Sequence, residues 1–245
     1  MTKPQRALVL GGGGALGAAV MEQLLASHRF DRVGVVAARA FKPALRGLQP
    51  VPDEPGALAA FGATTALVVF DRQRHANGRD AAFVRPEPGA LAARAAQLHA
   101  AGVRALVVVV PHAPALLPQA LQAGLANLDE GAVAAMDFEQ LVFMRMAQSG
   151  GAVGAIGSWA ARLAGWMLAQ LHWMVPQREQ PVRVATVARF AAALAVALRQ
   201  APRGTRVLPP EWLWLAAQGD DVATLAERWL AGQPPPASAA MRQRW

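Results

Sequence analysis

The chain has 245 residues, 54% of them hydrophobic, so it is long enough to bury one large core. It has no cysteine, which excludes a disulfide framework, a thiolate nucleophile and a cysteine-ligated metal. The formal net charge is +8, but the basic residues are scattered singly, without a Lys/Arg run that has interleaved aromatic residues. We therefore expect no nucleic-acid partner.

Strand-like and helix-like patterns alternate through the first half of the chain. We predict strands at Ala7–Leu10, Arg32–Ala37, Thr65–Phe70, Arg104–Val110 and Gln140–Arg145. Helices are expected at Ala15–Ser27, Glu87–Ala101 and about 115–136, the second closed by Gly102 in a left-handed cap. Residues 49–57, which contain three prolines, are expected to form a loop. This order predicts an α/β protein with a Rossmann-like doubly wound parallel sheet and helices on both faces.

The last third of the chain is mostly helical in pattern. Helices are predicted at Ser158–His172 and Thr186–Gln200, one or two more at Pro209–Leu230, and a short strand at Thr205–Leu208. We expect a single domain over residues 1–231, with its core at 6–148 and a small, mostly helical C-terminal part at 149–231. Residues 232–245 include three consecutive prolines and are expected to form a mobile tail.

Two features bear on the surroundings of the protein. The most apolar later stretch, residues 152–175, is interrupted by polar residues, so no membrane span is expected. No apolar signal region precedes the first strand, so we expect a cytoplasmic protein.

Trp159, Trp166 and Trp173 recur every seven residues and would form one stripe on a helix. A core face, a dimer seam and the lid of a pocket are alternative roles for this stripe.

Four consecutive glycines separate the first predicted strand from the first helix. Gly12-x-Gly14-x-x-Gly17 fits the dinucleotide fingerprint, and Gly11-x-x-Gly14-x-x-Gly17 fits its short-chain-dehydrogenase variant. Glycine permits a tight turn and close approach of a diphosphate, and the helix start offers unpaired N–H groups. We expect the residues of this turn to bind a dinucleotide: Gly11, Gly12, Gly13, Gly14, Ala15, Leu16 and Gly17. The alternative is a turn that only lets strand and helix pack closely.

The end of the second predicted strand bears on which dinucleotide binds. A carboxylate that holds a ribose 2′-hydroxyl should follow there, but the chain reads Ala37-Ala38-Arg39. Arg39 can face a 2′-phosphate instead, which favours NADP(H) over NAD(H). The alternative is a solvated arginine.

Several segments together resemble one family. The chain is similar to atypical short-chain dehydrogenase/reductases of the Tat-interacting oxidoreductase type, which are relatives of the sugar-nucleotide epimerases. The first half carries this resemblance in LVLGGGGALG, VGVVAAR, AAFVRPE before AGVRALVVVV, and DFEQLVFMRM. The later segments PVRVATVARFAAAL and RVLPPEWLWLA extend it, so that it covers roughly residues 6–216. It implies an NAD(P)-binding Rossmann fold and oxidoreductase chemistry.

The resemblance also implies roles for particular residues. Gly11, Gly14 and Gly17 match the family's phosphate-binding turn. Arg39 matches the second of two basic residues in NADP-preferring members, whereas Ala38 departs from the first. Phe70 and Asp71 stand where the family has a small, glycine-containing turn against the cofactor, so both are candidate cofactor-binding residues.

The catalytic residues of that family are missing. Its members use a tyrosine as general acid/base, a lysine four residues later that lowers the tyrosine's pKa, and a serine that orients the carbonyl. Those positions align here with Ala126, Glu130 and Val110-Pro111, and the chain has no tyrosine. His112, just past the fourth predicted strand, is a candidate substitute for the missing proton donor. The alternative is a loop histidine without a role.

Three functions remain open from the sequence. The first is an NADP(H)-binding protein that acts as a binding or regulatory pseudo-enzyme. The second is an active NAD(P)H-dependent oxidoreductase that uses His112 or water as proton source. The third is a structural partner protein with a vestigial cleft. Besides the dinucleotide, a small molecule, another protein or a second copy of this chain are the partners considered.

Overall fold

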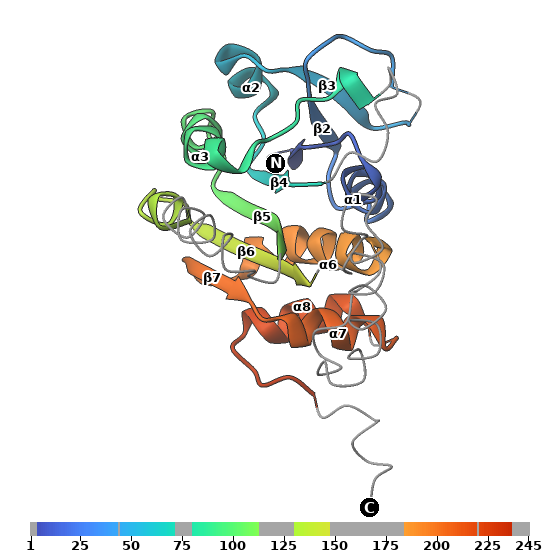
Figure 1. The fold of residues 1–245 in the computed structure, drawn as a ribbon, viewed down its shortest axis with the longest axis vertical. Coiled ribbons are helices and arrows are strands. Elements are labelled where there is room, and N and C mark those ends of the chain that lie inside the picture. The colour runs from blue at the N-terminus through green and yellow to red at the C-terminus, as the bar shows by residue number, and fades with distance from the viewer. Residues whose placement is uncertain are drawn as a thin grey trace, which may run out of the picture.

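The computed structural model describes residues 4–43, 45–71, 80–112, 130–147, 184–219 and 221–236. Its centre is one sheet of seven strands in the order β3-β2-β1-β4-β5-β6-β7, and every neighbouring pair is parallel (Figure 1). The strands are β1 (Arg6–Leu10), β2 (Arg32–Ala37), β3 (Leu48–Pro52), β4 (Thr65–Val69), β5 (Ala105–His112), β6 (Gln140–Ala147) and β7 (Gly204–Leu208). The first six follow the usual strand order of the Rossmann fold. The predicted fold class is confirmed.

Helices cover both faces of the sheet. They are α1 (Ala15–Ala26), α2 (Pro55–Phe61), α3 (Leu91–Ala100), α6 (Val184–Ala197), α7 (Pro210–Ala217) and α8 (Val222–Leu230). Short 3-10 turns occupy Asp80–Ala82, Pro88–Ala90 and Leu198–Gln200. Helices α2 and α3 lie on one side of the sheet, and α1 and α6 lie on the other (Figure 1). The central strands therefore lack polar alternation, because both of their faces are buried.

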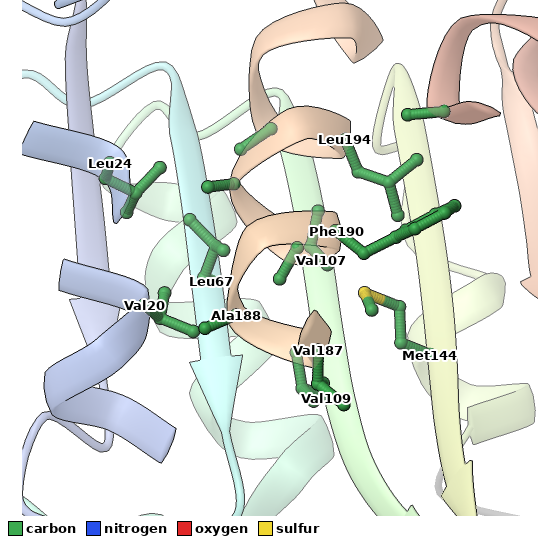
Figure 2. Close-up of a cluster of buried hydrophobic side chains, with 14 of the residues drawn as sticks. Val20, Leu24, Leu67, Val107, Val109, Met144, Val187, Ala188, Phe190 and Leu194 are labelled. Carbon is green, nitrogen blue, oxygen red and sulfur yellow. The ribbon is translucent and has the colours of Figure 1, made fainter. Parts of the chain in front are cut away.

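Helix α6 completes the core on its side of the sheet. Its residues Phe190 and Leu194, both 0% exposed, lie over β5 and β6, as Figure 2 shows. Helix α1 packs beside α6 and contributes Val20 and Leu24 to the same cluster (Figure 2). A segment near the end of the chain thus shares one hydrophobic core with the first helix.

The prediction of a loop at residues 49–57 is wrong. Leu48–Pro52 forms β3, the edge strand beside β2, and the following residues begin α2 at Pro55. Proline is tolerated at both places, since an edge strand has N–H groups without ladder partners and the first turn of a helix has free ones. Reading the prolines only as loop residues missed both elements.

Most other predicted elements are found within a few residues of their expected bounds. The helix at Thr186–Gln200 corresponds to α6 with its closing 3-10 turn, and the region Pro209–Leu230 contains two helices, α7 and α8. Gly102 follows α3 with a φ of +97°, which confirms the left-handed cap. Of the helix expected at 115–136, residues 130–134 are described and helical.

Besides the helix at 115–136, three further structural predictions fall wholly or partly outside the described residues. They concern the helix at Ser158–His172, the tryptophan stripe that it carries, and the tail beyond residue 236. Among the helices of the described ranges, none is both long and apolar enough to cross a membrane.

Candidate functional site

The strand order places a natural ligand position between β1 and β4. From β1 the sheet continues to β2 and β3 on one side and to β4 through β7 on the other. Ligands of open α/β sheets bind at the carboxyl ends of the strands where the order reverses in this way. The glycine turn follows β1, and Phe70 with Asp71 follows β4, so the two predicted segments meet at this point.

Two glycines of the turn are required by packing alone. A Cβ on Gly11, whose φ is +98°, would lie 2.1 Å from the carbonyl oxygen of Val69 at the end of β4. A Cβ on Gly17 would lie 2.0 Å from the carbonyl oxygen of Gly11. The turn, β4 and α1 are therefore in backbone contact, and no side chain fits between them.

Asp71, which follows the neighbouring strand β4, caps the start of helix α1. The N-cap residue of this helix is Gly14, which has no side chain to bond the free N–H groups of the first turn. Instead, the Leu16 N–H donates to Asp71 Oδ2 at 2.7 Å, although the two residues are 55 positions apart. The carboxylate faces the positive end of the helix, where an anion is stabilised.

Gly14 leaves the space that this carboxylate occupies. A Cβ on Gly14 would lie 2.6 Å from Asp71 Oδ2 and 3.1 Å from Asp71 Cγ. The φ of Gly14 is +129°, which also disfavours any other residue. In this structure, the room beside the helix start is thus filled by the protein's own carboxylate.

A second segment covers the turn from the side of β2. Phe83 forms an antiparallel bridge with Ala37, the last residue of β2. Its Cδ1 atom would be 3.1 Å from a Cβ on Gly12, and its ring contacts that of Phe41 edge-on, with centroids 5.1 Å apart. The sequence analysis did not identify Phe83 as a site residue, although Phe83 lies in the AAFVRPE segment that contributes to the family resemblance.

The remaining predicted cofactor residues have different surroundings. Phe70 is 6% exposed and belongs to the hydrophobic cluster that includes residues of α2 and α3. Arg39 is exposed just beyond β2, and its guanidinium has no partner within the described part of the chain. Gly13 is half-buried, and Ala15 is exposed at the first position of α1. Arg39 is therefore the predicted residue that is available to a ligand at the end of β2.

An ion pair occupies one of the positions that align with the family's catalytic residues. Glu130 Oε2 lies 2.5 Å from Arg145 Nη2, and the Glu130 side chain is only 13% exposed. Arg145 is next to Val110 in the register of β6 and β5, close to the carboxyl ends of these strands. His112 is the last residue of β5 rather than a residue beyond it. The His112 side chain and Ala126 lie outside the described parts of the chain.

Comparison with known proteins supports the architecture. No family model matches the chain, and no curated protein matches it. Among solved structures, a protein from Bacillus halodurans described as an NAD-dependent epimerase/dehydratase is 11% identical and has a TM-score of 0.55. The match covers 91% of this chain and 99% of the other.

A second solved structure has a similar relationship to this chain. It is that of AtPrR2 with NADP⁺ and (+)-pinoresinol, which is 13% identical and has a TM-score of 0.51. Its match covers 94% of this chain and 76% of the other. At such low identity these similarities concern the fold, and together with the strand order they show that the chain has a Rossmann-like α/β fold.

Proposed function

We propose that this chain is an NADP(H)-binding protein that lacks the proton-transfer residues of short-chain reductases and acts by binding. The observation that carries the proposal is the glycine turn from Gly11 to Gly17, which joins β1 to α1 where the strand order reverses. Main-chain N–H groups at such a helix start can bond a diphosphate. The Rossmann-like similarities to the two solved structures are consistent with this role.

The residues present fit a dinucleotide in part. The turn is bare at Gly11, Gly14 and Gly17, and the exposed Arg39 lies beyond the end of β2, where a 2′-phosphate would be recognised. The Asp71 carboxylate does not fit in its present position, because it already accepts the hydrogen bond of the Leu16 N–H. Binding of a diphosphate through that N–H therefore requires the Asp71 side chain to move.

Loss of the ancestral chemistry is part of the proposal. The chain has no tyrosine, and Glu130, at the position that aligns with the catalytic lysine, is engaged by Arg145. A carboxylate cannot lower the pKa of a neighbouring acid as an ammonium group does. Such a protein would report or deliver the dinucleotide, or hold it for a partner, rather than transfer its hydride.

Binding is tested by titrating the protein with NADPH and with NADH while the coenzyme fluorescence is followed. We expect saturable binding of both and tighter binding of NADPH. Arg39→Ala should weaken the binding of NADPH by about tenfold or more, because a hydrogen bond between charged groups is lost. The same substitution should leave the binding of NADH nearly unchanged. Arg104→Ala is the matched control, because Arg104 is exposed just before β5, at the amino end of that strand and therefore away from the candidate site. The proposal would be contradicted if neither the wild type nor a variant without the Asp71 carboxylate bound either coenzyme at millimolar concentration.

The absence of turnover is tested by following NADPH oxidation with a panel of aldehydes and quinones. We expect rates no higher than those without protein. Steady turnover that is lost in His112→Ala would contradict the pseudo-enzyme proposal and favour an active oxidoreductase with His112 as proton donor.

A further inference from the structure

We propose that Asp71 is an internal competitor for the phosphate and thereby determines how tightly the site holds an anionic ligand. Its carboxylate accepts the Leu16 N–H at 2.7 Å, at the second helical position of α1. This N–H belongs to the group of donors that a bound diphosphate would use. The inference rests on the proposed function, because it concerns the same turn.

The competition has two physical parts. The first is occupancy, since the carboxylate oxygen already takes a free donor of the helix start. The second is charge, since a phosphate placed beside Asp71 would bring two anions together near one positive helix end. A ligand with an uncharged group at this point would meet only the first of these obstacles, and a ligand with no group there would meet neither.

The close approach of Asp71 is built into the turn. A Cβ at position 14 would lie 2.6 Å from Asp71 Oδ2, so any residue other than glycine would displace the carboxylate. Gly14 therefore serves the capping contact as well as any ligand. The glycine pattern that predicts a phosphate site is, in this structure, also the pattern that admits the competitor.

Only the side chain of Asp71 needs to move for the site to open. The residue before it is fixed, because Phe70 is buried in the core and its N–H donates to the Val109 carbonyl at 3.1 Å. Asp71 itself is half-buried. A rotation of its side chain, rather than a shift of β4, would free the Leu16 N–H for a ligand.

Apparent affinity then depends on the fraction of molecules in which Asp71 has turned away. Removing the carboxylate should therefore tighten the binding of NADPH. For Asp71→Ala we expect an increase of about tenfold, because both occupancy and charge are lost. Asp71→Asn should give a smaller increase, since its amide oxygen can still accept the Leu16 N–H while the charge is gone. Adenosine, which has no phosphate, should bind equally well to all variants.

The experiment compares NADPH and adenosine binding to the full-length wild type, Asp71→Asn, Asp71→Ala and Asp221→Ala by calorimetry. Asp221→Ala is the matched control, because Asp221 also caps a helix, accepting the Ala223 N–H of α8. Asp71→Asn keeps the test valid if Asp71→Ala fails to fold. Tighter NADPH binding in the Asp71 variants alone supports the proposal, whether or not the wild type binds measurably.

Two results would overturn it, and they differ. If the wild type binds NADPH and the Asp71 variants bind it equally or more weakly, Asp71 is no competitor, but the proposed function stands. If neither the wild type nor any variant binds NADPH at millimolar concentration, the proposed function fails, and this inference fails with it.

Discussion

The glycines of one turn serve different purposes at the level of single residues. Gly11 and Gly17 are in contact with backbone atoms, so they hold strand and helix together whatever the site binds. Gly14 borders the Asp71 carboxylate, which can move. The fingerprint predicts all three glycines alike. Gly11 and Gly17 are required by packing in any case, so only Gly14 is indicative of a ligand.

A substitution at Gly17 should therefore reduce stability. Its Cβ would lie 2.0 Å from the Gly11 carbonyl oxygen, so Gly17→Ala forces backbone apart and should cost about 1–3 kcal/mol of unfolding free energy. Gly56→Ala is the control, because a Cβ there meets nothing within 4 Å and Gly56 lies in helix α2. It should be neutral or stabilising by up to about 1 kcal/mol. Urea unfolding measures both, and equal stabilities would contradict the backbone contact.

Residue patterns predict part of the candidate site and miss the rest. The glycine spacing and the place of Arg39 after a strand are local features, so the sequence contains them. The bond between Asp71 and Leu16 joins residues that are 55 positions apart, and Phe83 reaches the turn through a bridge to β2. Such contacts depend on the paths of loops in three dimensions, for which a single sequence has no periodic signal.

Among the elements, α6 contributes most clearly to the core. Seven of its residues are buried, and it contacts α1, α7 and α8 as well as the sheet. It lies far from α1 in sequence, yet the two helices pack against each other on the same face of the sheet (Figure 2). The sequence predicts this helix by its apolar residues, but not which face of the sheet it covers.

Truncating a buried side chain of α6 should be costly. Phe190 is 0% exposed, so Phe190→Ala should lower the unfolding free energy by about 3–5 kcal/mol through lost burial and the cavity left behind. Val184→Ala, at the start of the same helix and 38% exposed, should change it by less than about 0.5 kcal/mol. Denaturant unfolding of both variants measures the difference, and a small effect at Phe190 would mean that α6 is not packed as described.

The cap of α8 gives a dependence on pH. The pKa of Asp221 lies below its ordinary value of 3.8, first because the Thr224 hydroxyl donates to its carboxylate and then because the Ala223 N–H does. A lowered pKa in the folded state means that the carboxylate stabilises the fold above its unfolded pKa. This contribution is lost as the pH falls through the folded value. The thermal unfolding midpoint of Asp221→Asn should thus lie below that of the wild type at about pH 6, and the gap should narrow below about pH 3. A constant gap would show that ionisation is not involved.

On the scale of the whole molecule, the C-terminal elements are part of the main core rather than an appendage. One cluster of buried residues includes side chains from α1, the central strands, α6, α7 and α8. Composition and pattern predict the α/β class and a domain core at 6–148. They do not show that a helix from beyond residue 148 covers β4 and β5 on the face that it shares with α1, because coverage depends on how distant helices dock.

A chain that ends at residue 148 should therefore not fold cooperatively. It would lack α6, α7 and α8 and would expose Val107, Val109 and Met144, all 0% exposed in the full chain. We expect retained far-ultraviolet circular dichroism, strong binding of a hydrophobic dye and no sharp thermal transition. A chain that ends at residue 236 is the control and should unfold like the full-length protein. Cooperative unfolding of the shorter chain would show that the first part is an independent domain.

The two prolines of β3 also affect whether this edge strand can pair with a strand of another molecule. Pro50 and Pro52 lie two residues apart in the strand, so their missing N–H groups belong to the same side of it. Because β3 still pairs with β2, that side is the outward edge of the described sheet. A foreign strand that tried to extend the sheet there would find too few donors. The outward edge of β3 is therefore a poor partner for a strand from another molecule.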